Sequence, residues 1–236
     1  MENKILGLHH ITAIANNAKI NHDFYTKVLG LRMVKKTVNF DDPNTYHFYY
    51  GNENGAPGTI LTFFPWEGIG KGYTGTGQAT EIGYSVPEGS LDFWANRFKE
   101  NNITIGEKSE RFGEHFLPFQ DPDGLNLSLI VPKQKDNRIV WETNEIKQDT
   151  ATKGFHNITL TLKSIDKTAK ILTDIFGYEL ISQENNRFRF ATNAVENASI
   201  VDLLEEPNGK PGYNAAGTNH HVAFRVPNEE VLMNFR

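Results

Sequence analysis

Short apolar segments separated by turn-forming residues run through the whole chain. Residues 31–38, 46–50 and 59–64 are rich in β-branched and aromatic side chains, and stretches such as Asp-Asp-Pro-Asn and Gly-Asn-Glu-Asn-Gly lie between them. This pattern predicts three strands joined as a meander. An alternating segment near the start of the chain predicts one further strand before them.

Apolar residues between the first strand and the meander recur at the spacing of a helix. These residues are Ile20, Phe24 and Val28, and Ile171 and Ile175 recur in the same way later in the chain. Residues suited to begin and end these helices are Asn17 and Ser164 at the N-cap and Gly30 and Gly177 after the last turn. The predicted order of elements is therefore β-α-β-β-β.

This unit occurs more than once in the chain. Adding 147 to the numbers of Gly7, His9, Ile11, Thr12 and Gly30 gives, without a gap, Gly154, His156, Ile158, Thr159 and Gly177. An offset of 140 relates Tyr84-Ser85-Val86-Pro87 to Phe224-Arg225-Val226-Pro227. Chance does not easily produce such register, so the sequence predicts a duplicated unit with corresponding positions.

The repeat predicts two domains joined by a linker. The N-terminal domain spans residues 1–132, with modules at 1–66 and 76–132. Residues 133–152 are polar and charged, which is typical of a linker. The C-terminal domain spans 153–236, with a module at 153–207 and the start of a fourth module at 217–236. By comparison with the second module, we expect the remainder of the fourth module to lie beyond Arg236.

Composition limits the classes of function. The chain has 236 residues, is 38% apolar and carries 24 basic against 29 acidic residues, for a net charge of −5. No run of like charge occurs, so neither nucleic acid nor an anionic membrane surface is an expected partner. We expect a cytoplasmic protein, since the start of the chain does not look like a signal peptide and no apolar stretch approaches the roughly 20 residues that span a bilayer. The absence of cysteine excludes disulfides and thiolate metal sites.

Two adjacent-histidine segments, Gly-Leu-His9-His10-Ile-Thr12 and Asn-His220-His221-Val-Ala, begin the first and fourth modules. An isolated histidine pair in a strand is more often structural than metal-binding. Because this pair recurs at the corresponding strand of a duplicated unit, a metal site shared by the two segments is the stronger interpretation.

Five strings together carry a resemblance to a known family. GLHHIT, YHFYYGN..GAPGTILTFFPW, YSVP..SLDFWANRF, ERFGEHFLPFQDPDGL and NHHVAFRVP span essentially the whole chain. They resemble the ring-cleaving dioxygenases of the vicinal-oxygen-chelate (glyoxalase/bleomycin resistance/extradiol dioxygenase) superfamily, and more narrowly its hydroquinone-cleaving branch. The resemblance implies an α+β fold of tandem βαβββ modules paired into incomplete β-barrel cups.

The resemblance also implies a site and an activity. In the family, Fe(II) is held by two histidines, which match His10 and His221 here, and by a glutamate whose strand would lie beyond Arg236. Supporting catalytic positions of the family match His9, Thr12 and His220. The implied reaction is cleavage of a hydroquinone or catechol-like aromatic ring by O₂. Ligand identity does not separate iron from Mn(II) or Zn(II).

Such ligands suit this chemistry. Two imidazoles and a carboxylate on one face of Fe(II) leave positions open for a substrate oxygen and O₂. Each imidazole must be neutral, and its outer N–H needs a partner that fixes the tautomer. On a regular strand His10 and Thr12 point to one side and His9 to the other, so His9 would reach the site only if the strand end is twisted or the pocket is wide.

Other residues have weaker claims. Glu81 and Asn157 occupy the positions of the second and third modules that correspond to His221 and His10. His156 lies next to Asn157 and is interpreted as structural, and Asp202 lies on the last strand of the third module, roughly where a ligand carboxylate would be. Because the family pairs the first module with the fourth, these residues belong to the half without metal. The run Phe63-Phe64-Pro65-Trp66 could shape an aromatic pocket, although ordinary core is the preferred interpretation. The glycine-dense residues 67–77 predict a mobile connection, and His22, His47 and His115 have no ligand spacing, which favours surface or core roles.

Two other functions remain open at this point. A glyoxalase-like lyase or isomerase would use the same fold and a metal that polarises its substrate, and a metal-free protein of the bleomycin-resistance kind would only bind a small molecule. If the chain ends at Arg236, the first module lacks most of its partner, and a homodimer could cover the exposed apolar face.

Overall fold

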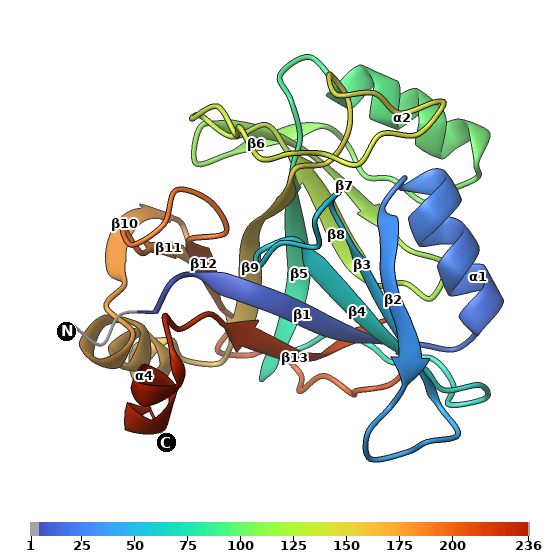
Figure 1. The fold of residues 1–236 in the computed structure, drawn as a ribbon. Coiled ribbons are helices and arrows are strands. Elements are labelled where there is room, and N and C mark those ends of the chain that lie inside the picture. The colour runs from blue at the N-terminus through green and yellow to red at the C-terminus, as the bar shows by residue number, and fades with distance from the viewer. Residues whose placement is uncertain (1–4, 236) are drawn as a thin grey trace.

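The computed structural model describes residues 5–235 as two strongly curved sheets with helices on their outer faces (Figure 1). The strands in this part of the chain are β1 (Leu8–Ala15), β2 (Arg32–Val38), β3 (Tyr46–Gly51), β4 (Ile60–Pro65), β5 (Gln78–Ser85), β6 (Ser109–Arg111), β7 (Glu114–Gln120), β8 (Asn126–Ile130), β9 (Gly154–Leu162), β10 (Glu179–Glu184), β11 (Arg187–Ala191), β12 (Ile200–Glu205) and β13 (Thr218–Phe224). The helical segments are α1 (Ala18–Asp23), η1 (Phe24–Val28), α2 (Leu91–Glu100), α3 (Asp166–Lys170), η2 (Ile171–Ile175) and α4 (Glu229–Asn234).

The first sheet joins the first module to the start of the fourth. Its strand order is β13-β1-β4-β3-β2. Strands β1 and β4 are parallel, whereas β13 pairs with β1 in the antiparallel direction. The first and fourth modules therefore share one continuous sheet, and β1 lies between the last strand of its own module and the first strand of the other.

The second sheet joins the second and third modules in the same manner. Its order is β10-β11-β12-β9-β5-β8-β7-β6, with β5 and β9 antiparallel at the seam. Within each module the first and last strands are parallel, as in the first sheet. The predicted α+β architecture of paired βαβββ modules is thus confirmed. The predicted domain boundaries stay a prediction.

The helices follow the predicted ends but not the predicted apolar stripe. Asn17 caps α1, its side chain accepting from the Ile20 N–H at 2.9 Å, and Gly30 follows the last turn with φ +71. Ile20, however, is 53% exposed. The inward face of the helix is instead formed by Asn21, Phe24 and Tyr25, which are buried. After them α1 continues into η1, a π-helical turn in which the Leu29 N–H donates to the Phe24 carbonyl five residues back.

The third module shows the same departure. Its π-helical turn η2 places Ile171 and Ile175 on the surface, 45% and 52% exposed, whereas Leu172 is buried. Gly177 has the predicted left-handed backbone, with φ +74. The prediction of an N-cap at Ser164 was wrong by one residue, because Ile165 occupies the cap position; the Ser164 hydroxyl accepts from the Asp166 N–H at 3.3 Å.

Residues 133–152 contain no strand or helix and are mostly exposed, but a few of them are anchored in the core. Val140, Ile146 and Ala151 are buried in the core, and Ile146 covers Gly30 so tightly that a Cβ there would lie 2.4 Å from its Cδ1. The segment predicted as a linker is thus attached to the core through these apolar side chains.

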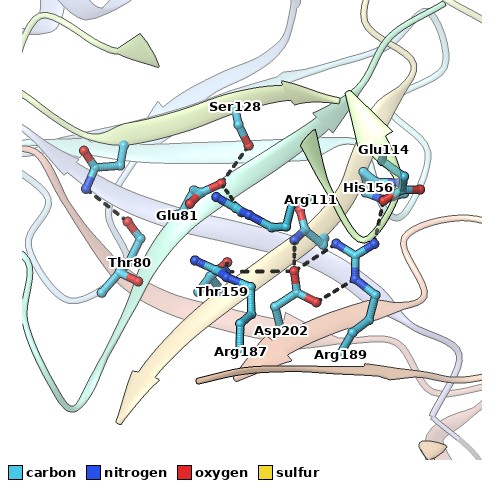
Figure 2. Close-up of polar contacts among 12 residues, drawn as sticks. Thr80, Glu81, Arg111, Glu114, Ser128, His156, Thr159, Arg187, Arg189 and Asp202 are labelled. Carbon is cyan, nitrogen blue, oxygen red and sulfur yellow. Dashed lines mark hydrogen bonds and ion pairs between the residues drawn. The ribbon is translucent and has the colours of Figure 1, made fainter. Parts of the chain in front are cut away.

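A buried group of charged residues lies on the inner face of the second sheet (Figure 2). Arg189 of β11 donates to Asp202 of β12 at 2.8 and 3.0 Å and to Glu114 of β7. The same Glu114 oxygen lies 3.0 Å from Nε2 of His156. Burial opposes ionisation of Glu114, but His156 and Arg189 outweigh it and lower the pKa of its carboxyl to about 2.

Because that pKa lies below the ordinary value of 4.5, the ion pair stabilises the fold fully above pH 4.5, and the stabilisation is lost as the pH falls toward about 2. We expect Glu114→Gln to lower the free energy of unfolding by about 3 kcal/mol at pH 7 and to have little effect near pH 2. Urea unfolding at both pH values measures this. Glu110→Gln, an exposed carboxylate on the neighbouring strand, is the control, and an equal effect of Glu114→Gln at both pH values would contradict the assignment.

Candidate metal centre

Strands β1 and β13 pair in a register that is interrupted twice. The pairs run from Leu8↔Phe224 to His10↔Ala223, and then from Thr12↔His221 to Ala13↔Asn219. In the first step β1 advances two residues while β13 advances one, so His9 is an extra residue. In the second step the extra residue is His220. Each histidine pair therefore begins with the bulged residue of its strand.

The bulges explain how neighbouring histidines reach the same site. Successive side chains of a regular strand point to opposite faces, but a bulge redirects one of them. His9 Nδ1 lies 3.0 Å from His10 Nδ1, and His220 Nδ1 lies 2.8 Å from His221 Nδ1. The condition stated from the sequence for His9, a distorted strand end, is therefore met.

His10 and His221 face each other across the two strands. Their Nε2 atoms are 3.2 Å apart and their rings meet edge to face, with centroids 5.3 Å apart. Two imidazole nitrogens bound at right angles to one divalent ion, each at about 2.1 Å, would be separated by about 3.0 Å. The observed spacing fits a shared cation. The predicted neighbourhood of the two segments is confirmed, and the metal role itself stays a prediction.

Thr12 connects His221 to the interior of the sheet. Its Oγ1 lies 3.0 Å from His221 Nε2 and 2.7 Å from the hydroxyl of Thr62 on β4. Thr62 in turn lies 2.9 Å from Nε2 of His47, whose Nδ1 is 2.9 Å from the hydroxyl of Tyr49. A chain of hydrogen bonds thus runs from β3 through β4 and β1 to the histidines.

His47 is the residue of this site that the sequence interpretation missed. It has no histidine or carboxylate at ligand spacing, and nothing in the chain shows that β3 lies two strands away from β1. The sequence shows only that His47 and Tyr49 are two residues apart in a predicted strand, which places both side chains on one face of β3.

The pKa values of four histidines of this face, His9, His10, His47 and His221, are lowered. Burial lowers the pKa of His10 to about 4, and the neighbouring imidazoles contribute further. Burial, followed by the charge of His221, likewise lowers the pKa of His47 to about 4. The pKa values of His9 and His221 are lowered by partial desolvation of their rings, although one edge of each faces solvent, with added repulsion from Arg225 and His220 respectively. Neutral imidazole is the form that binds a metal ion.

Aromatic rings stand beside the histidines. The Phe64 ring centroid lies 4.4 Å from that of His47 and 5.5 Å from that of His220, and Trp66 is 6.2 Å from His220. Phe63, by contrast, points into the core against Tyr25. The aromatic run therefore divides: alternate residues flank the site or fill the core. His9, His220 and His221 are exposed, so the face is open.

The weaker candidates lie elsewhere. Glu81, Asn157, His156 and Asp202 are on the second sheet. The glycine-dense residues 67–77 form isolated bridges with residues 211–216. Within residues 5–235, no three His, Asp or Glu side chains are grouped so that they could hold one metal ion. The first sheet thus offers a pair of imidazoles.

Comparison with known proteins identifies similar chains. The model of the Glyoxalase/Bleomycin resistance protein/Dioxygenase superfamily matches residues 7–129. The chain is 45% identical over 230 residues to a Bacillus subtilis (strain 168) protein named "Putative ring-cleaving dioxygenase MhqO", covering 98% of this chain and 72% of that protein. It is 32% identical over 233 residues to the chlorohydroquinone/hydroquinone 1,2-dioxygenase of Sphingobium indicum, covering 97% and 73%.

Solved structures agree on the fold. A crystal structure of a "putative dioxygenase from Bacillus subtilis subsp. subtilis str. 168" superimposes with a TM-score of 0.92 at 44% identity, covering 98% of this chain and 74% of that chain. Glyoxalase I from Zea mays gives a TM-score of 0.70 at 13% identity, covering 96% and 78%, which shows a common fold only. No helix among residues 5–235 has the length and apolar character needed to cross a membrane.

The lowered pKa values predict the titration of the metal-free protein. We expect His10 and His47 to protonate with midpoints near pH 4, because burial disfavours the charged rings. Since the unfolded chain binds these protons nearer pH 6.5, folded stability decreases as the pH falls between those values. Imidazole NMR signals recorded against pH, assigned with His10→Asn and His47→Asn variants, measure the midpoints. Midpoints at or above pH 6.5 would contradict the described environment.

Proposed function

This chain belongs to the Glyoxalase/Bleomycin resistance protein/Dioxygenase superfamily, and from that premise we propose that it is an Fe(II)-dependent enzyme that uses O₂ to cleave the ring of a hydroquinone or catechol-like substrate. The observation that carries the proposal is the meeting of His10 and His221, with Nε2 atoms 3.2 Å apart on an open face. Relatives that are 32–45% identical and are named as ring-cleaving or hydroquinone dioxygenases support it.

In the proposed site, His10 and His221 hold the metal through their Nε2 lone pairs. A bound ferrous ion would supply positions for a substrate oxygen and O₂, and a route for electron density from the ring to O₂. The two rings are suited to this because their lowered pKa values keep them neutral near pH 7.

His9 and His220 are positioning residues in this proposal. With Nε2 engaged, the proton of each ligand ring resides on Nδ1, which lies 3.0 Å from His9 in one case and 2.8 Å from His220 in the other. Each bulged histidine thus accepts the outer N–H of the ring beside it and fixes its tautomer and orientation. The 3.0 Å contact of Thr12 Oγ1 is to this same Nε2 of His221, so metal binding would release it and leave the Thr12 hydroxyl bonded to Thr62 at 2.7 Å.

The aromatic surroundings favour a flat ring as substrate. Phe64 and Trp66 stand beside His220, and His47 lies against Phe64. Flat faces with polar edges suit a ring that carries hydroxyl groups. The hydrogen-bonded series from Tyr49 through His47 to Thr12 offers polar atoms along one side of the same face.

Metal binding tests the ligands directly. We expect His10→Ala and His221→Ala each to weaken Fe(II) binding under anaerobic conditions by more than about 100-fold, and His9→Ala and His220→Ala to weaken it by about 10–100-fold. Equilibrium dialysis with metal analysis measures this. His115→Ala, an exposed histidine on the second sheet, is the matched control. Unchanged metal content in both His10→Ala and His221→Ala would exclude the proposed pair.

Oxygen uptake tests the reaction. We expect the Fe(II)-loaded chain to consume one O₂ for each hydroquinone opened, and the Zn(II)-loaded chain to consume none, because Zn(II) is not redox-active. An oxygen electrode together with the absorbance of the ring measures both. Conversion of substrate without O₂ uptake would instead favour a lyase or isomerase, and binding without conversion in the iron-loaded protein would favour a binding protein.

A further inference from the structure

One row of side chains crosses the whole first sheet. The directly opposed pairs are His221 and Thr12, Thr12 and Thr62, Thr62 and Tyr49, and Tyr49 and Lys35. The row therefore runs from β13 through β1, β4 and β3 to the edge strand β2. Because directly opposed residues of neighbouring strands point to the same face, Lys35 lies at the far end of the face that carries His221.

Side-chain contacts agree with this direction of Lys35. Its Nζ stands 5.3 Å from the ring centroid of Tyr49, whose hydroxyl lies 2.9 Å from Nδ1 of His47. The Nε2 atom of His47 lies 2.9 Å from the Thr62 hydroxyl. Burial, then the charge of His221 and then the charge of Lys35 lower the pKa of His47. The amine of Lys35 thus lies on the histidine side of the sheet.

Lys35 has no carboxylate partner in the described part of the chain. Its contact is with the ring of Tyr49, whereas Lys19 and Lys108 each pair with an aspartate. The groups whose charge acts on the imidazoles of this face are other histidines, Arg225 and Lys35, and no described carboxylate is among them. An open face therefore carries a lysine charge that the described residues do not compensate.

The corresponding row of the second sheet is neutralised from within. This sheet forms the second half-barrel, as the first sheet forms the first, and its row consists of Glu81, Thr159, Asp202, Arg189 and Ser182. The Arg189 guanidinium donates to Asp202 at 2.8 and 3.0 Å (Figure 2). The protein itself thus compensates the cation of the second row, whereas the cation of the first row is available to an anionic ligand.

The strand spacing sets the size of a ligand that would join both ends of the first row. Neighbouring strands are about 4.8 Å apart, so Thr12 on β1 and Tyr49 on β3 are separated by about 10 Å. Nε2 of His221 lies beside Thr12, and the amine of Lys35 lies over Tyr49. The separation is close to the length of one benzene ring with an oxygen on each side and a polar contact of about 2.8 Å at each end.

We propose that Lys35 is a specificity-determining residue that pairs with a negatively charged substituent, such as a carboxylate, of an aromatic diol whose hydroxyl group lies at His10 and His221. This assignment rests on the proposed function for the orientation of the ring. An ammonium group is a point charge with three donors and pairs readily with a carboxylate. A neutral substituent at the same place accepts only an ordinary hydrogen bond. Diols with an acidic group are therefore favoured over neutral ones.

Binding of a matched pair of probes tests this. The probes are 2,5-dihydroxybenzoate and its neutral counterpart 2,5-dihydroxybenzamide, and anaerobic equilibrium dialysis against the metal-free chain, read by the absorbance of the ring, measures their binding. We expect the benzoate to bind about fivefold more tightly than the benzamide, as for an exposed ion pair. The difference should decrease as salt is raised, because salt screens exposed charges.

Variants at Lys35 assign the preference to this residue. Lys35→Met should weaken binding of the benzoate alone, and Lys35→Arg, which keeps the positive charge, should retain the preference. Lys36→Met is the matched control, because Lys36 lies on the other face of β2, with its amine 4.5 Å from the ring centroid of Tyr46. Equal binding of the two probes, no binding of the benzoate, or a preference that survives Lys35→Met would each overturn the proposal.

The dialysis distinguishes a failure of this proposal from a failure of the proposed function, since it uses neither iron nor O₂. A preference that depends on Lys35, found in a chain that consumes no O₂ when loaded with Fe(II), would support the role of Lys35 and contradict the dioxygenase. Oxygen uptake by a chain that binds both probes equally would do the reverse.

Discussion

The pairing of β1 with β13, in a register interrupted by one extra residue on each strand, is the constraint on which the candidate site depends. Without the first interruption His9 would point away from His10, and without the second His220 would point away from His221. With both, four imidazoles lie along one seam, two facing each other and two behind them. The extra residues are thus part of the site.

The same seam is used twice with different chemistry. In one half-barrel its inner face carries neutral imidazoles, and in the other it carries buried carboxylates matched by guanidinium groups. Backbone geometry alone therefore does not determine what a half-barrel of this fold binds.

Much of this arrangement could be predicted from the sequence, because duplication makes equivalent positions recognisable by subtraction. The offsets of 147 and 140 relate His10 to Asn157 and His221 to Glu81, and the cap at Asn17 and the left-handed Gly30 were also correct. The bulges could not be predicted, since one inserted residue changes a side chain's direction without changing composition. The exposed Ile20 was mispredicted because the inward face of α1 includes the polar Asn21, which an apolar pattern does not reveal. His47 was missed because its role depends on strand order, which local sequence does not encode.

The separation of the paired strands along the chain also orders their assembly during translation. Thr12 and His221 are 209 positions apart, whereas only α2, β6, β7, β8 and residues 133–152 separate β5 from β9. A chain that folds as it leaves the ribosome completes the second half-barrel with β12, which ends at Glu205, and only then adds β13 at Thr218–Phe224. Until then β1 has an open edge, of the kind that invites pairing with another chain. The seam between β1 and β13 therefore forms after the second half-barrel, and β1 is open to misassembly in a newly made chain until it does.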